Sequence, residues 1–182
     1  MTVRPALRVK PSAFRLPVLA AALGALALSA ASAAEMHRAR CHQDMCEWFS
    51  IESKELVASD ARATVFKVTT KNWTSEHPNA AYNKKAPRVG GDAFTGYFKC
   101  SKSKPAYVES QDGKWTATFL DVRNPPGFAE SVVMQYFVVC HGFDTDKSKS
   151  DFDVVGRKFG YRKISQAPAA IALSKPEEIL TR

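Results

Sequence analysis

Short apolar runs separated by turn residues make up most of the chain after position 34, and several of them alternate between apolar and polar side chains. Residues 63–70 (ATVFKVTT) alternate with a period of two, which is typical of a half-buried strand. Residues 93–100 alternate in the same way around Gly96, where a bulge or a close packing contact is expected. These patterns favour β structure for the body of the chain.

A hairpin is predicted at residues 106–122, because Asp112-Gly113 separates two β-prone runs there. The nearly continuous apolar run SVVMQYFVVC at residues 131–140 predicts a central strand that is covered on both faces. Two weaker strands are expected at residues 47–52 and 153–161. Together the runs predict an all-β domain, a sandwich or a small barrel of about seven or eight mostly antiparallel strands.

The N-terminus has a different pattern, that of an export signal. A basic start with Arg4, Arg8, Lys10 and Arg15 precedes an uncharged stretch rich in Ala and Leu, and Ala31-Ser32-Ala33 supplies small residues for a peptidase. Cleavage after Ala33 or Ala34 is therefore expected. A retained anchor is the alternative, because residues 16–34 approach the roughly 20 residues that span a bilayer.

Three segments follow from these patterns. Residues 1–33 are the predicted signal, and residues 34–163 are the predicted β domain. Residues 164–182 are rich in Ala and Pro and are expected to form an irregular tail, with one short helical turn around residues 176–180. No stable membrane span is expected after cleavage, which indicates a periplasmic or secreted protein.

Four cysteines, Cys41, Cys46, Cys100 and Cys140, all follow the predicted signal. An even number in an oxidising compartment predicts two disulfides, for which three connectivities exist. Pairing of Cys41 with Cys46 and of Cys100 with Cys140 is favoured. The first pair closes a short loop, and the second pair ends two apolar runs that can face one another.

The charge balance is mildly basic once the signal is set aside. The formal charge is +8, and four of the positive charges belong to the signal, which leaves +4. Such a bias suits an anionic envelope polysaccharide or an acidic protein as partner, and it gives no reason to expect nucleic acid.

The longest non-periodic stretch, residues 71–92, mixes cations with aromatic side chains, and a loop of this length is often functional. Cations meet anionic groups while aromatic rings stack on sugars or apolar side chains. The candidate binding residues here are Trp73, His77, Tyr82, Lys84, Lys85 and Arg88. The strand expected near the C-terminus adds Arg157, Lys158, Arg162 and Lys163. A solvated loop and an edge strand protected by charge are the alternatives.

The sequence also contains residues that suit two other kinds of site, a metal site and a hydrolase site. The segment from His37 to Cys46 holds two His, two Met and two Cys, which suits copper or zinc if the thiols stay reduced. A disulfide between Cys41 and Cys46 removes both thiolates, so no metal or cofactor is predicted. A hydrolase needs a carboxylate pair such as Glu109 and Asp121, but no nucleophile, phosphate-binding or dinucleotide motif occurs, so no catalytic residue is predicted.

The sequence thus predicts an exported, disulfide-stabilised binding protein that recognises an anionic envelope polysaccharide or an acidic protein surface, with inhibition of another protein among its modes of action. An envelope hydrolase and a periplasmic metal-binding protein remain the alternatives.

Overall fold

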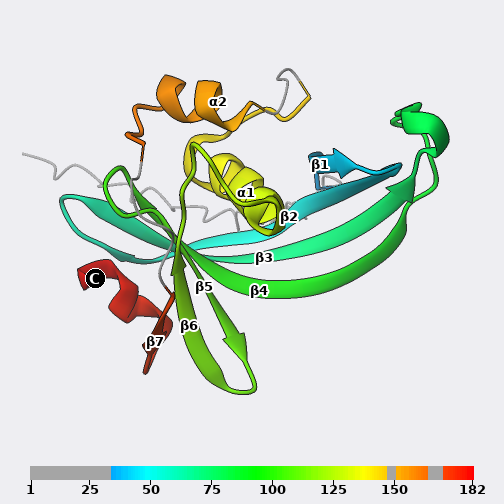
Figure 1. Cartoon of the computed structure of the whole chain (residues 1–182). Coiled ribbons are helices and arrows are strands. Elements are labelled where there is room, and N and C mark those ends of the chain that lie inside the picture. The colour runs from blue at the N-terminus through cyan, green and yellow to red at the C-terminus, as the bar shows by residue number, and fades with distance from the viewer. Residues whose placement is uncertain (1–33, 147–150, 164–169) are drawn as a thin grey trace, which may run out of the picture. The chain divides into compact units, whose positions relative to one another are not determined.

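Seven antiparallel strands pair in chain order to form one strongly curved sheet (Figure 1). The computed structural model describes residues 34–146, 151–163 and 170–182, so the predicted signal lies outside the described residues. The strands are β1 (Met36–His42), β2 (Met45–Ser59), β3 (Ala63–Glu76), β4 (Val89–Ser101), β5 (Ala106–Gln111), β6 (Lys114–Phe119) and β7 (Ala170–Leu173). The predicted all-β, mostly antiparallel fold class is confirmed.

Helices are few and short. Among the described residues two are α-helices, α1 (Glu130–His141) and α2 (Phe152–Lys158), and three are short 3-10 helices, η1 (Pro78–Ala80), η2 (Gly127–Ala129) and η3 (Pro176–Thr181). In the described ranges no helix is long and apolar enough to cross a membrane.

The predicted hairpin is present between β5 and β6. Gln111 pairs with Lys114, and Asp112 and Gly113 both have positive φ, 51° and 75°. Two successive positive φ values match the right-handed twist of the flanking strands, which is why Asp-Gly is favoured at this point.

Residues 131–140 form most of helix α1, and the predicted central strand is wrong. An apolar run without a period of two does not distinguish a buried strand from a buried helix. Pro125 and Pro126 lie ahead of the run, and Gly142 ends the helix in the left-handed conformation, with φ 60°. The helix is buried on several sides through Val133, Met134, Tyr136, Phe137 and Val139.

The weaker strand predicted at residues 153–161 is also wrong, because this stretch forms α2 and the turn that follows it. The carboxylate of Asp151 accepts a hydrogen bond from the Val154 amide and caps the helix, and Gly160, with φ 78°, lies just beyond its end. Arg157 and Lys158 therefore belong to the last turn of a helix and not to a basic edge strand.

The C-terminal residues are ordered parts of the fold where they are described. Residues 170–173 form β7, which pairs with β6, and η3 confirms the helical turn expected around residues 176–180. Ile179 has no exposed surface, so the irregular tail predicted for residues 164–182 is wrong for residues 170–182. Residues 164–169 lie outside the described residues.

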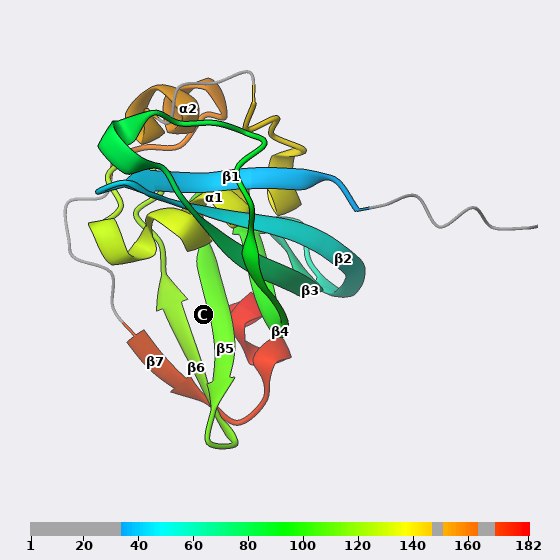
Figure 2. The same ribbon diagram turned by 90° about the vertical axis from the view of Figure 1, so that its right-hand side faces the viewer.

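The two faces of the sheet carry separate cores. On the face covered by α1, Phe49, Val68 and Phe98 pack against the helix. On the opposite face, Val65 and Tyr97 join the cluster that includes Ile179 of η3. The views in Figures 1 and 2 show α1 and the C-terminal turn on opposite sides of the central strands.

Both predicted disulfides are present. Cys41 and Cys46 face one another across β1 and β2, and Cys100 of β4 is bonded to Cys140 near the end of α1. The second bond joins the helix to the sheet, whereas the prediction placed it between two strands.

The two disulfides are expected to contribute unequally to stability. Their sequence separations are 40 and 5 residues, and a longer closed loop restrains the unfolded chain more, by about 4 against about 2 kcal/mol in the chain-entropy model. Urea unfolding of the double alanine variants Cys100→Ala/Cys140→Ala and Cys41→Ala/Cys46→Ala measures the difference. Equal losses of unfolding free energy would contradict this expectation.

A buried polar chain lies beside the second disulfide. The Tyr136 and Tyr161 hydroxyls are 2.8 Å apart, and Nε2 of His141 lies 2.7 Å from the Tyr161 hydroxyl. The His141 ring also stacks on Phe159 with a centroid distance of 4.3 Å. Burial, together with the nearby charge of Lys102, lowers the pKa of His141 from 6.5 to about 4.

Acidification from about pH 6.5 to 4 should therefore destabilise the protein through His141. In this window the unfolded chain binds a proton at His141 that the folded chain does not, so stability is unaffected above pH 6.5 and falls as the pH approaches 4. His141→Gln keeps a hydrogen-bonding side chain that does not titrate and should flatten the slope of unfolding free energy against pH. His42→Gln, at an exposed histidine, is the control and should keep the wild-type slope.

Candidate functional site

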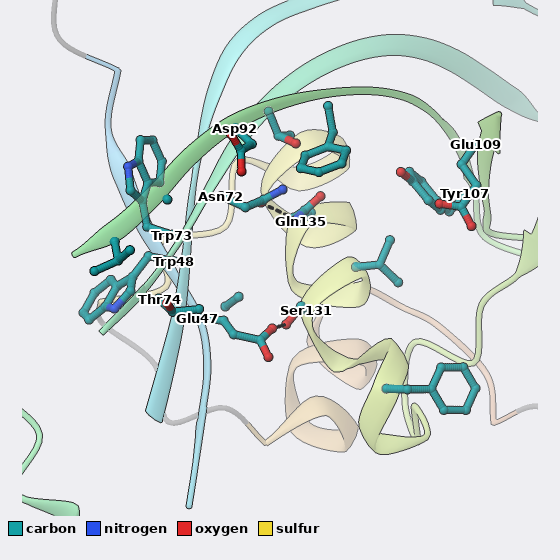
Figure 3. A pocket seen from close by; sticks show the side chains of 17 residues that line it. Glu47, Trp48, Asn72, Trp73, Thr74, Asp92, Tyr107, Glu109, Ser131 and Gln135 are labelled. Carbon is teal, nitrogen blue, oxygen red and sulfur yellow. Dashed lines mark hydrogen bonds between the residues drawn. The ribbon is translucent and has the colours of Figure 1, made fainter. Parts of the chain in front are cut away.

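An open groove of about 610 Å³ lies between the sheet and the first half of α1 (Figure 3). Side chains from β2, β3, β4 and β5 line its sheet side, and Ser131, Val132 and Gln135 line its helix side. Its volume is within the range of sites that hold small ligands or a few side chains of a partner.

Alternation along the strands places the polar groups of the groove. Asn72 of β3 points to the helix, where its Oδ1 accepts a hydrogen bond from Gln135 Nε2 at 3.2 Å. Asp92 of β4 pairs with Asn72 across the two strands, and Glu109 of β5 lies two residues after Tyr107 on the same face. Gln135 is the one polar residue inside the apolar run of α1.

Glu47 is the most constrained carboxylate of the groove. Arg40 donates to its Oε1 through Nε at 2.8 Å and Nη2 at 2.7 Å, and the Ser131 hydroxyl donates to its Oε2. Burial by itself raises the pKa of Glu47, but the hydrogen bonds from Arg40 and Ser131 and the charge of Arg40 outweigh it and lower the pKa below its ordinary value. Glu47 is thus held ionised, unlike a general acid.

Five aromatic side chains line the groove, each from a different element: Trp48 of β2, Trp73 of β3, Phe94 of β4, Tyr107 of β5 and Phe128 of η2. Phe94 of β4 and Phe128 of η2 are 57% and 86% exposed, whereas Tyr107 of β5 is half-buried. Burial, with a smaller effect of the Glu109 charge, raises the pKa of Tyr107 to about 12. A Cβ at Gly96 would lie 2.6 Å from the Tyr107 ring, which confirms the close packing contact expected at this glycine.

The predicted 71–92 loop is shorter in the structure than in the sequence analysis. Residues 71–76 continue β3 and residues 89–92 begin β4, so the connection spans residues 77–88 and contains η1. We call these twelve residues the η1 loop. The register between β3 and β4 shifts at Trp73, where Gly90, with φ 119°, passes close to the backbone of Asn72 and Trp73, and Gly91, with φ 105°, passes close to the indole ring.

His77 holds the η1 loop from inside. It is 2% exposed, its Nε2 lies 2.7 Å from the Ser75 hydroxyl, and its Nδ1 accepts from the Asn83 amide at 3.0 Å. Asp44 adds two contacts, because its carbonyl accepts from the His77 amide and its carboxylate accepts from the Ala80 amide. Both ring nitrogens of His77 are thus used within the protein, and we assign it a positioning role.

The remaining candidates of this loop lie at its surface. Tyr82 is 49% exposed and packs edge-on against His77. Lys84 forms an exposed ion pair with Asp146 at 2.8 Å, and the Arg88 guanidinium lies 4.3 Å over the Trp48 ring and donates to the Lys84 carbonyl. Lys85 is exposed. The structure therefore brings the three cations together on one loop.

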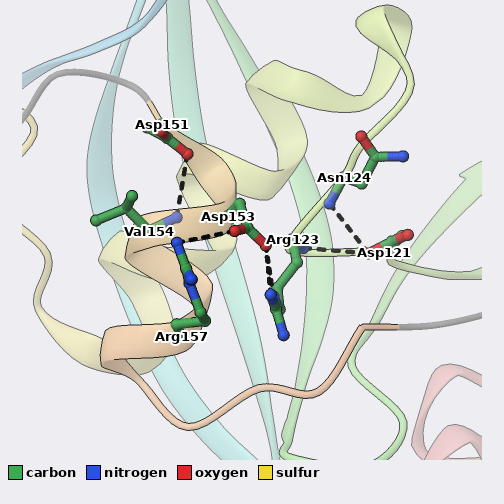
Figure 4. A network of polar contacts seen from close by, with 7 residues as sticks. All are labelled: Asp121, Arg123, Asn124, Asp151, Asp153, Val154 and Arg157. Carbon is green, nitrogen blue, oxygen red and sulfur yellow. Dashed lines mark hydrogen bonds and ion pairs between the residues drawn. The ribbon is translucent and has the colours of Figure 1, made fainter.

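The second basic group lies elsewhere. Arg157 pairs with Asp153 at 3.0 Å, and Asp153 also accepts two hydrogen bonds from Arg123 (Figure 4). A Cβ at Gly156 would lie 2.5 Å from Arg123, so this glycine leaves room for that arginine beside α2. Lys158, Arg162 and Lys163 are exposed. Figure 1 shows α2 well separated from the η1 loop, and the two basic groups do not form one surface.

The residues of the two alternative sites are not brought together. Glu109 lines the groove, whereas Asp121 lies outside it and accepts hydrogen bonds from the amides of Arg123 and Asn124 (Figure 4). Cys41 and Cys46 are bonded to one another, and His37 is buried against Phe49. Among the described residues no three His, Cys, Asp or Glu side chains group as metal ligands.

Comparison of the chain with protein-family models, with curated proteins and with solved structures gave no match. The site is therefore interpreted from its own geometry.

The ionisation of Glu47 can be tested directly. Arg40→Met removes a double hydrogen bond and a charge, so the pKa of Glu47 should rise above that in the wild type, and Ser131→Ala should raise it less. NMR titration of the glutamate side-chain carboxyl carbons measures both shifts. A wild-type Glu47 that titrates above its ordinary range would instead favour the hydrolase alternative.

Proposed function

We propose that this chain is an exported, disulfide-stabilised binding protein that recognises an anionic partner, an envelope polysaccharide or an acidic protein surface, through the η1 loop. The observation that carries the proposal is the fixed conformation of this loop, on which Lys84, Lys85 and Arg88 are exposed.

A fixed loop favours binding because less conformational freedom is lost when the partner docks. His77 Nδ1 accepts a hydrogen bond from the Asn83 amide, and the Asp44 carboxylate accepts one from the Ala80 amide, so the loop is fixed at two points. The Trp48 ring packs against the Arg88 guanidinium. The Trp48 indole donates a hydrogen bond to the Ser75 hydroxyl at 2.7 Å, and the same hydroxyl is hydrogen-bonded to His77, so Trp48 and His77 are linked through Ser75. The cations are therefore presented by a preformed surface.

The chemistry of the loop suits carboxylate, phosphate or sulfate groups. Arginine binds such groups through two parallel hydrogen bonds, and lysine binds them as a point charge. Tyr82 offers an exposed ring beside the cations, which suits a sugar ring or an apolar side chain. Inhibition of another protein is one way in which such a surface acts.

Export is supported by two features that agree with one another. The order of charged, apolar and small residues at the N-terminus is that of a signal, and both cysteine pairs are at disulfide distance in the structure. A periplasmic or extracellular location is part of the proposal.

The test is retention on heparin–agarose and on polyglutamate–agarose, which represent the two classes of partner. Lys84→Glu/Lys85→Glu/Arg88→Glu should weaken binding to the matrix that retains the wild type about tenfold or more, since each exposed ion pair contributes about 0.2–1 kcal/mol. Retention of the wild type should fall with salt, because exposed charges are screened within about 8–10 Å at physiological ionic strength.

The matched control is Lys104→Glu/Lys114→Glu/Lys175→Glu, which makes the same change in net charge at exposed lysines outside the η1 loop. It should retain most of the binding. Equal losses in the two triple variants would mean that only net charge matters and would remove the η1 loop from the proposal. Tyr82→Ala should lose a part of the affinity that salt hardly affects.

A further inference from the structure

The groove between α1 and the sheet carries the opposite charge to the η1 loop. Glu47, Asp92 and Glu109 line it, and its lining contains no Lys, Arg or His. Glu47 is paired with Arg40, whereas no described residue forms an ion pair with Asp92 or Glu109. Two carboxylates in the groove are thus available to an incoming cation, and an anionic partner is repelled.

Each of these two carboxylates has an aromatic neighbour on its own strand. Asp92 and Phe94 lie two residues apart on β4, and Tyr107 and Glu109 lie two residues apart on β5, so each pair shares the groove face. An aromatic face attracts a cation through its quadrupole and also packs against an aliphatic stem. The acid and aromatic pair, present on both strands, suits Arg and Lys side chains.

The rim of the groove exposes more apolar surface than a bound small cation would cover. Phe128 is 86% exposed and Val89 is 75% exposed, in addition to Phe94. Contiguous apolar surface bordered by polar groups is typical of an interaction site. Covering it requires a ligand with apolar parts.

An amide pair inside the groove matches a peptide backbone. One bond joins Gln135 Nε2 to Asn72 Oδ1, and the other amide groups, Asn72 Nδ2 and Gln135 Oε1, have no partner among the described residues. They offer one donor and one acceptor, which is what each residue of an extended peptide also offers. The ammonium group of a small amine only donates hydrogen bonds, so it can pair with Gln135 Oε1 but not with Asn72 Nδ2.

We propose that this groove binds a basic, extended peptide segment of a partner protein. Its Arg or Lys side chains pair with Asp92 and Glu109 and pack on Phe94 and Tyr107, its backbone meets Asn72 and Gln135, and its apolar side chains cover Phe128. This site uses other residues than the cations of the η1 loop, and the proposal does not rest on the function proposed for that loop.

The experiment uses the mature, oxidised protein and an array of short, end-capped peptides in which arginine alternates with leucine, phenylalanine or alanine. Binding of the best peptide is then measured by calorimetry beside its citrulline counterpart, which keeps the shape and loses the charge. The wild type should bind the arginine peptide at least about tenfold more tightly, as expected for two exposed ion pairs supported by aromatic rings.

Two variants locate the site. Asp92→Asn/Glu109→Gln should weaken binding about fivefold to tenfold and reduce its salt dependence, and Phe94→Ser/Phe128→Ser should weaken it about tenfold with the salt dependence unchanged. Both change exposed side chains, and thermal unfolding checks that they fold. Glu55→Gln/Asp112→Asn, at exposed carboxylates outside the groove, is the control and should bind as the wild type does.

Three results would overturn the proposal: no arginine peptide binds, the citrulline peptide binds equally well, or spermine or arginine amide binds as tightly as the peptide, which would make this a small-amine site. Lys84→Glu/Lys85→Glu, which leaves Arg88 in place on the groove-lining Trp48, should leave peptide binding intact. The groove and the η1 loop therefore fail or succeed separately.

Discussion

Burial of α1 is the constraint on which the rest of the structure depends. The helix carries large apolar side chains on most of its surface, and a helix of that kind has to be enclosed by other elements. The curved sheet encloses it, because β2, β3 and β4 are long and their register shifts, as it does between Ile51 and Ser53, let the sheet bend around the helix. The bulges in these strands thus allow the sheet to curve and pack around α1.

The groove is a by-product of the same packing. The second half of α1 is fixed to the sheet through Cys140 and through Tyr136, which bonds to the backbone of Ser101. The first half packs on the sheet through Val133 and Met134 and adds two polar contacts on the groove side, Ser131 with Glu47 and Gln135 with Asn72. The groove lies where these polar contacts join the two layers.

Local patterns predicted the inner strands of the sheet, but not its outer strands β1 and β7 or its α-helices. Alternation at residues 63–70 and the Asp112-Gly113 turn specify strands through interactions between near neighbours, and the structure agrees. The run at residues 131–140 has no such periodicity, since a buried helix and a buried strand need the same apolar side chains. Only the sheet that surrounds the run decides between them, and that sheet is built from distant parts of the sequence.

The candidate site was predictable only in part, for a related reason. Lys84, Lys85 and Arg88 are close in sequence, so their grouping on one loop could be expected. The groove joins Glu47, Asp92 and Gln135 from three separate segments, and nothing in the sequence places them together. A lone polar residue, Gln135 within the apolar run of α1, was the one available signal for it.

The basic net charge of the chain conceals an uneven distribution. Cations gather on the η1 loop, and uncompensated carboxylates gather in the groove. Because exposed charges are screened over about 8–10 Å, each region presents its own sign to a partner at short range. Total charge is therefore a poor guide to what this protein attracts.

The disulfide between Cys100 and Cys140 also affects when the wall of the groove becomes fixed. It anchors the helix that forms one wall of the groove, and the bond forms only after the chain meets an oxidising environment. A reduced chain lacks this anchor, so its groove wall is held only by packing and by the hydrogen bonds of Tyr136, Ser131 and Gln135. Oxidation of this cysteine pair thus links the wall of the groove to the redox state of the surroundings.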